Sequence, residues 1–134
     1  MSREIKFRAW DKEEKCMIFD VQNTYDYGAG GCKAMEESFG CLLKNRDFEV
    51  MQYTGIHDKN GKEIYEGDIL KDVGEIKFGV WYAYLENGLG GSYHITGFYI
   101  PGDSGEPDRP IEDDQFNEVI GNIYENPELL SKEV

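Results

Sequence analysis

The sequence is short of positive charge, cysteine, histidine and long apolar runs, and each shortage excludes a class of protein. Its 134 residues carry 14 Lys and Arg against 27 Asp and Glu, which gives a formal net charge of −13. A chain this acidic repels a nucleic-acid phosphate backbone and an anionic membrane unless its few cations gather on one face. No stretch approaches the roughly 20 consecutive apolar residues that span a bilayer, so we expect no membrane-spanning helix.

Cysteine and histidine are too few for the usual disulfide or metal frameworks. The three cysteines, Cys16, Cys32 and Cys41, are an odd number that cannot pair completely, and we expect reduced thiols. A metal site of Cys32 and Cys41 with His57 or His94 stays an alternative, although no Cys-x-x-Cys spacing supports it. Neither histidine has a recognisable serine, cysteine or acid arrangement beside it. We therefore predict no metal, no cofactor and no enzymatic activity.

The first residues bear on where the chain works. Met1 to Arg8 is charged throughout and lacks the apolar segment of a secretory signal peptide. We expect the chain to stay in the cytosol in which it is made.

Short alternating apolar runs, separated by glycine-bearing turns, are the main pattern that is present. An aromatic share of 13% with 16 glycines and only 4 prolines is typical of a globular β protein. A chain of this length buries roughly two thirds of the surface that it exposes when unfolded, so a real core is expected. The fold class is therefore predicted to be mainly β.

The N-terminal part is predicted to begin with a β-hairpin. Residues 4–9 alternate between apolar and polar, and Met17, Phe19 and Val21 repeat the alternation after a charged turn at residues 11–15. The pattern then weakens. We expect a glycine-rich loop at residues 25–31 and one or two helical turns from Lys33 to Phe39 that end at Gly40.

Two tight turns are predicted in the centre of the chain, where Asn60 and Gly61 tolerate positive φ at low steric cost. Gly67 is expected to supply positive φ in the second turn, and Asp68 to accept backbone N–H bonds there, as in an Asx-turn. Ile69 and Leu70 should then enter the core.

The carboxylates of this region have two interpretations. Glu63, Glu66 and Asp68 form either a cluster for metal or acid–base chemistry or an ordinary part of a surface turn. Carboxylates at surface turns are usually solvated, whereas acid–base chemistry needs a pocket that shifts their pKa values. We favour the structural interpretation.

The longest β pattern runs from Glu75 to Leu85 and is predicted to pair with residues 93–100. One face is expected to enter the core, and it comprises Ile76, Phe78, Val80, Tyr82 and Tyr84. The other face is apolar as well, so another layer or a partner should cover it. A covering N-terminal subdomain and an intermolecular contact are both open. The candidate interaction surface comprises Trp81, Ala83, Leu85 and Phe98.

An acidic, proline-rich loop is predicted from residue 101 to residue 117. Its carboxylates lack the ligand spacing of a calcium loop, so a solvated loop is favoured over cation binding or mimicry of nucleic-acid phosphate. They are Asp103, Glu106, Asp108, Glu112, Asp113 and Asp114. A final strand is expected from Glu118 to Tyr124, and a short helical turn after Pro127.

One small feature favours nucleic-acid binding. Lys6, Arg8 and Trp10 share one face of a predicted strand, where cations can hold phosphate and an aromatic ring can stack on a base. Glu4 and Asp11 flank this stripe, and cations beside acids usually form a mixed surface. Nucleic-acid binding is therefore the alternative function.

Three separated runs resemble the YopX family of bacteriophage and prophage proteins. They read REIKFRAWD from Arg3 to Asp11, MQYTG and DKNGKEIYEGDIL from Met51 to Leu70, and VIGNIYENPELL from Val119 to Leu130. The resemblance implies a phage-derived chain in a bacterial host, with an SH3-type β-barrel or roll in its later part. It implies no established activity and no catalytic residues.

The interpretation that combines these patterns has two domains and one class of function. Residues 1–47 are expected to form a β-hairpin subdomain, and residues 48–134 an SH3-like barrel or roll with the acidic loop. The acidic surface and the two-faced aromatic strands favour a non-enzymatic accessory protein that binds another protein, of host or phage, or copies of itself. A replication or transcription protein is one candidate partner.

Overall fold

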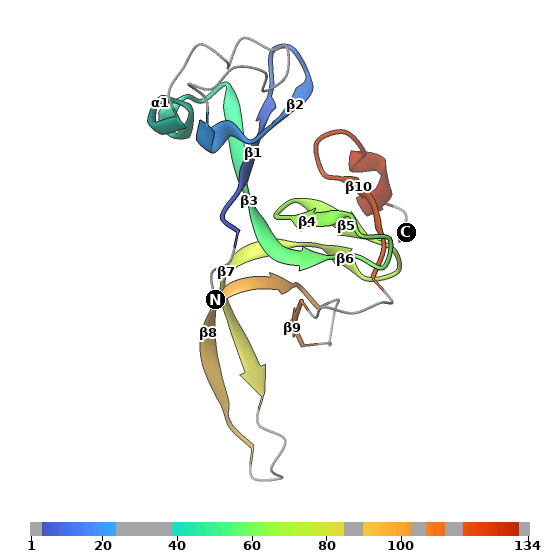
Figure 1. The fold of residues 1–134 in the computed structure, drawn as a ribbon. Helices are drawn as coiled ribbons and strands as arrows, with labels where there is room; N and C mark the ends of the chain where they lie inside the picture. The colour runs from blue at the N-terminus through green and yellow to red at the C-terminus, as the bar shows by residue number, and fades with distance from the viewer. Residues whose placement is uncertain (1–3, 24–38, 85–89, 103–106, 112–116, 132–134) are drawn as a thin grey trace. The chain divides into compact units, whose positions relative to one another are not determined.

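The computed structural model describes residues 4–23, 39–84, 90–102, 107–111 and 117–131 (Figure 1). The chain is mainly β, which confirms the predicted fold class, while the SH3-type connectivity remains a prediction. It divides into two compact units, Met1–Gly55 and Ile56–Val134. The predicted boundary, between residues 47 and 48, lies just before strand β3 (Phe48–His57). The boundary between the two compact units lies inside that strand. Among the described residues, no helix is long and apolar enough to cross a membrane.

The first unit contains the predicted N-terminal hairpin. Strand β1 (Phe7–Asp11) pairs antiparallel with β2 (Cys16–Phe19) and, on its other side, with β3. The charged turn between β1 and β2 is held by Asp11, because its Oδ1 accepts hydrogen bonds from the backbone N–H groups of Glu13 and Glu14, both at 3.0 Å. Val21, expected in the second strand, instead begins the 3-10 helix η1 (Val21–Asn23).

Helix α1 (Phe39–Lys44) also belongs to this unit and extends past the predicted end at Gly40. Residues 33–38 of the expected helix are outside the described part of the chain, and Gly40 lies within α1 instead of ending it. The physical reason is Leu42, which is fully buried against Ala9 and Ile18. Burial of such a side chain contributes about 2 kcal/mol and outweighs the roughly 1 kcal/mol cost of a glycine inside a helix.

The cysteines of this unit are in two states. Cys16 is disulfide-bonded, so the expectation of reduced thiols is wrong for this residue. Cys41 is exposed and is not part of a disulfide, as expected. An odd number of cysteines excludes complete pairing but still allows one bridge. Cys32 lies outside the described residues.

The second unit has its core under the central turns. Strand β4 (Glu63–Tyr65) neighbours β3, and a three-stranded sheet follows in the order β10 (Val119–Asn122), β5 (Asp68–Leu70), β6 (Gly74–Glu75). Ile69 and Leu70 are buried as predicted. The 3-10 helix η3 (Pro127–Ser131) supplies the expected helical turn after the last strand. The buried apolar cluster comprises Ile64, Leu70, Ile76 and Ile100.

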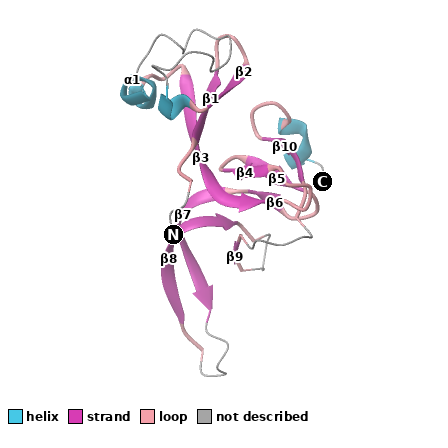
Figure 2. Ribbon diagram, in the orientation of Figure 1, coloured by secondary structure: helices cyan, strands magenta, loops and turns pink. Residues whose placement is uncertain are grey.

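The long predicted pair of strands is also present in this unit (Figure 2). Strand β7 (Lys77–Tyr84) pairs antiparallel with β8 (Ser92–Ile100), with Phe78 opposite Phe98 and Trp81 opposite Ile95. A short strand, β9 (Arg109–Pro110), adds to the end of β8, within the segment predicted as a loop. We call the β7–β8 pair the ribbon.

Candidate functional site

The two faces of the ribbon are the reverse of the sequence prediction. Trp81, expected on the outer face, is only 4% exposed, whereas Phe78 and Val80, expected in the core, are 51% and 57% exposed. Tyr82 is 49% exposed and lies on the same face as Phe78 and Val80. Of the predicted inward set with described side chains, only Ile76, which precedes β7, is buried.

Two aromatic rings cover the buried side of the ribbon. The rings of Trp81 and Tyr99 stack on this side, with centroids 6.2 Å apart and planes 17° from parallel. Gly79 lies opposite Gly97 on the same side, so neither strand presents a side chain at this rung. A Cβ atom on Gly79 would lie 3.8 Å from Tyr99 Cε1, an ordinary van der Waals distance, and one on Gly97 would meet nothing within 4 Å. The stacked rings, and not a steric need for glycine, therefore distinguish this side of the ribbon.

The opposite side of the ribbon is a ladder of exposed cross-strand pairs. Phe78 meets Phe98 edge to face at 5.0 Å, and Tyr82 meets His94 edge to face at 4.7 Å between ring centroids. Such aromatic pairs contribute about 0.5–1.5 kcal/mol beyond their burial, so they hold the surface in one arrangement. The ribbon face, as we define it, comprises Phe78, Val80, Tyr82, His94, Thr96 and Phe98.

The predicted interaction residues are divided by this geometry. Trp81 is buried, Ala83 is half-buried on the Trp81 side, and Phe98 is half-buried on the ribbon face. Leu85 lies outside the described residues. Sequence reasoning missed the exposure of Phe78, Val80 and Tyr82, because both faces of β7 are apolar and alternation alone does not tell them apart.

The basic stripe predicted for nucleic acid is not an open surface. Arg8 is only 4% exposed, and Trp10 is half-buried. Lys6 forms an ion pair with Glu4 at 3.5 Å, and its Nζ lies 5.6 Å from the centre of the Tyr53 ring. The three side chains therefore do not present themselves together to a phosphate backbone.

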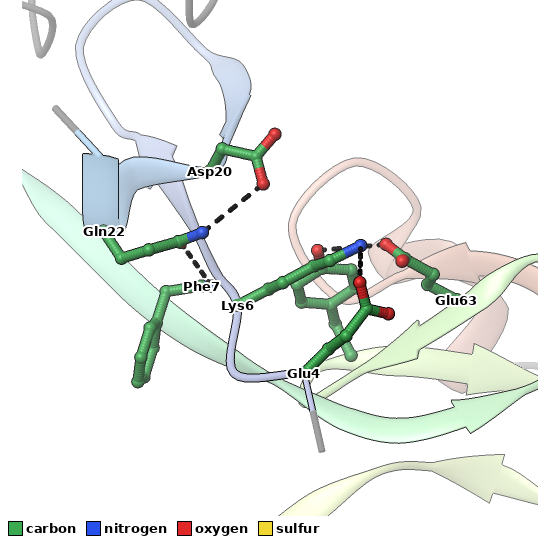
Figure 3. Close-up of polar contacts among 7 residues, drawn as sticks. Glu4, Lys6, Phe7, Asp20, Gln22 and Glu63 are labelled. Carbon is green, nitrogen blue, oxygen red and sulfur yellow. Dashed lines mark hydrogen bonds and ion pairs between the residues drawn. The ribbon is translucent and has the colours of Figure 1, made fainter. Parts of the chain in front are cut away.

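The beginning of β1, beside Lys6, is held by a side chain from η1 (Figure 3). The backbone N–H of Phe7 donates to Gln22 Oε1 at 2.8 Å, and Gln22 Nε2 donates to Asp20 Oδ1 at 3.5 Å. These contacts give the strand start a structural role.

Asp58 organises the first central turn. Its Oδ1 accepts from the backbone N–H groups of Asn60 and Lys62 at 2.8 and 2.9 Å, and its Oδ2 accepts from Val119 N–H at 3.0 Å. Burial raises the pKa of Asp58, but the hydrogen bonds from Val119, Lys62 and Asn60 and the Lys62 charge together lower it below its ordinary value. Gly61 has the predicted positive φ, at 82°, whereas Asn60 contributes its backbone N–H and not a positive φ.

The second central turn follows the prediction closely. Gly67 has a φ of 89°, and Asp68 Oδ2 accepts a hydrogen bond from Tyr65 N–H at 2.7 Å. Asp68 is 2% exposed, so its carboxylate is part of the turn and not of a surface cluster with Glu63 and Glu66. Within the described ranges, no three His, Cys, Asp or Glu side chains gather as a metal site would require.

Asparagines hold the C-terminal run in the same way. Asn122 Oδ1 accepts from the backbone N–H groups of Tyr124 and Glu125 at 3.0 and 2.8 Å. Asn126 Oδ1 accepts from Asn122 N–H at 3.2 Å. The polar residues of the runs that resemble a known family are thus largely engaged in fixing turns.

Of the six acidic residues singled out in the predicted loop, the structure describes Asp108. Asp108 is half-buried, and its Oδ1 accepts from Gly102 N–H at 2.9 Å. The other acidic residues of this prediction lie outside the described residues, and they are Asp103, Glu106, Glu112, Asp113 and Asp114.

Comparison with known proteins gives a family and a similar solved structure. A family model described as YopX protein matches residues 6–131. No curated protein matches the chain. The crystal structure of protein EF1440 from Enterococcus faecalis is similar, at 27% sequence identity over 96% of this chain and 99% of that one, with a TM-score of 0.47.

Proposed function

This chain belongs to the YopX protein family, and from that premise we propose that it is a non-enzymatic protein that binds another protein through the ribbon face. The observation that carries the proposal is the exposure of Phe78, Val80 and Tyr82 on one side of a two-stranded ribbon. Contiguous apolar side chains at the surface of a soluble protein often mark a binding site. Aromatic side chains are also the residues that contribute most to protein interfaces.

The non-enzymatic part of the proposal is supported by how the motif residues are used. Asp58, Asp68 and Asn122 direct their side-chain oxygens at backbone N–H groups of their own turns. A residue occupied in this way has a structural reason for its position. Nucleic-acid binding through Lys6, Arg8 and Trp10 is the weaker candidate, because Arg8 is buried.

We further propose the setting in which this binding occurs. The resemblance to phage and prophage proteins supports an accessory role in the cytosol of a bacterial host, with a host or phage protein as partner. A replication or transcription protein is a reasonable target, and this step rests on the family's setting alone.

Site-specific photo-crosslinking tests the ribbon face directly. A photoreactive phenylalanine analogue is placed at Val80 or, as a matched control, at Leu43 in α1; both side chains are 57% exposed. Irradiation in cells that naturally carry the gene is expected to give discrete protein adducts from position 80 only. Equal adduct patterns at both positions, or none from position 80, would contradict the proposal.

A further inference from the structure

The negative charge of the chain is concentrated in the unit that carries the ribbon. Residues 56–134 contain 17 Asp and Glu and 6 Lys and Arg, which leaves a charge of −11. Residues 1–55 contain 10 acidic and 8 basic residues, which leaves −2 of the total of −13. The second unit is therefore the source of most of the electric field around the chain.

Within this acidic unit the ribbon contains no acidic residue at all. Residues 77–84 and 92–100 include neither Asp nor Glu, and Lys77 is their one Lys or Arg. The ribbon face thus contains no Asp, Glu, Lys or Arg, although it belongs to a unit of charge −11. A partner that is attracted by the unit and also binds the face must combine positive charge with apolar side chains.

We propose that the partner of the ribbon face is a basic protein segment with apolar side chains, an inference that rests on the proposed function. Complementary charge accelerates the encounter of two proteins and disfavours partners of the wrong sign. Apolar contacts with desolvated aromatic residues supply most of the binding free energy. The net negative charge of the second unit thus attracts the segment, and the apolar side chains of the ribbon face bind it.

A second copy of the chain is a poorer fit to the same face. Phe78, Val80 and Tyr82 are about half exposed, so together they offer roughly 300 Å² of surface to a partner. A stable protein interface buries about 800 Å² on each side. Two copies would also bring together surfaces of the same sign, each from a chain of charge −13. A basic segment is attracted by the net charge of −11 on this unit, whereas a second copy would be repelled by it.

The spacing of the ladder suggests the form of the segment. Phe78, Val80 and Tyr82 are alternate residues of one strand, so they recur at about 6.4–6.8 Å. An extended peptide presents its own alternate side chains at the same spacing. Three apolar residues at alternate positions match the spacing of the face, and lysines or arginines on both sides of them match the negative net charge of the unit.

Fluorescence anisotropy with synthetic peptides tests the partner class on the full chain. The probe has three leucines at alternate positions between lysine clusters. A second peptide has serine in place of leucine, and a third has glutamate in place of lysine. We expect the probe to bind about tenfold more tightly than the serine peptide. The affinity of the probe should fall as the salt concentration is raised, and the glutamate peptide should not bind.

Protein variants show whether the peptide uses the ribbon face. The double substitution of Phe78→Ser and Val80→Ser is expected to lower the affinity for the leucine probe about tenfold and to leave the affinity for the serine peptide unchanged. Leu43→Ser, at an equally exposed leucine in α1, should change neither affinity. Circular dichroism and cooperative thermal unfolding confirm that each variant is folded before binding is measured.

Three results would overturn the partner class. They are equal affinity for the leucine and serine peptides, an unchanged affinity of the ribbon variant, and binding of the glutamate peptide as tightly as the probe. A dimer in sedimentation velocity that Phe78→Ser abolishes would assign the face to a second copy instead. If position 80 gives adducts but the leucine probe does not bind, only the basic partner is overturned. If position 80 gives no adducts and the leucine probe does not bind, the proposed function is overturned as well.

Discussion

The side-chain carboxylate of Asp58 accepts a hydrogen bond from the backbone N–H of Val119, a residue 61 positions further along the chain. The same carboxylate holds the first central turn through Asn60 and Lys62. One buried side chain therefore joins the turn to the last strand of the second unit. Its removal should affect both.

Replacing Asp58 by alanine is expected to destabilise the chain strongly. The substitution leaves three backbone N–H groups without their acceptor, and a hydrogen bond to a charged group contributes about 1.5–3 kcal/mol. Asn60 and Lys62 are exposed, so water replaces part of this loss, and we expect the free energy of unfolding, measured by urea denaturation, to fall by at least about 3 kcal/mol. Glu14→Ala, at an exposed turn residue of the first unit, is the control and should change it by less than about 0.5 kcal/mol. A cost for Asp58→Ala as small as that of the control would contradict this role.

The same residue should make stability depend on acid pH. The pKa of Asp58 is lower in the folded than in the unfolded chain, so its contribution is present above the unfolded pKa and is lost as pH falls through the folded pKa. The loss begins near pH 4, about the ordinary pKa of an aspartate. Urea unfolding of the natural chain and of Asp58→Asn should differ most at pH 7 and converge below pH 4. A difference that is constant across this range would show that the charge of Asp58 is not involved.

Gly121 is expected to tolerate no side chain. A Cβ atom at this position would lie 2.5 Å from Asn126 Oδ1, which itself accepts the Asn122 N–H. Gly121→Ala should therefore lower the free energy of unfolding by about 1–3 kcal/mol. Gly97→Ala is the matched control, because nothing lies within 4 Å of its Cβ position and its φ is ordinary. In a double-mutant cycle, Asn126→Ala should relieve part of the cost of Gly121→Ala; strict additivity would contradict the clash.

The two faces of the ribbon should differ in their contribution to stability. Trp81→Ala removes a buried ring that stacks on Tyr99, and we expect a loss of about 3–5 kcal/mol in the free energy of unfolding. Val80→Ala removes a side chain that is 57% exposed, so its cost should stay below about 1 kcal/mol. Thermal and urea unfolding of both variants provide the comparison. Equal costs, or a larger one for Val80, would mean that the ribbon has the orientation that the sequence alone suggested.

The features that sequence analysis predicted well are those that depend on local chemistry. The turn at Gly67 and Asp68 requires a residue that accepts positive φ followed by a short side-chain acceptor, and both requirements are visible in adjacent letters. The N-terminal hairpin and the pairing of β7 with β8 follow from alternating apolar residues and intervening turn residues.

The features that were missed depend on residues distant in sequence. Both faces of β7 are apolar, so alternation does not tell which one is buried. The buried side is the one on which Trp81 stacks on Tyr99 of the neighbouring strand. Likewise, α1 includes Gly40 because Leu42 packs against Ala9 and Ile18 of the hairpin. The burial of Arg8 was also invisible, because strand periodicity does not show what lies over a face.

The hydrogen bond between Val119 N–H and Asp58 closes a long segment of the chain, and both strands of the ribbon lie within that segment. This hydrogen bond uses no atom of the ribbon. The exposed side chains of the ribbon can therefore be replaced without breaking the bond that closes the segment. Substitutions on the ribbon face of this chain should therefore leave the Asp58–Val119 hydrogen bond in place.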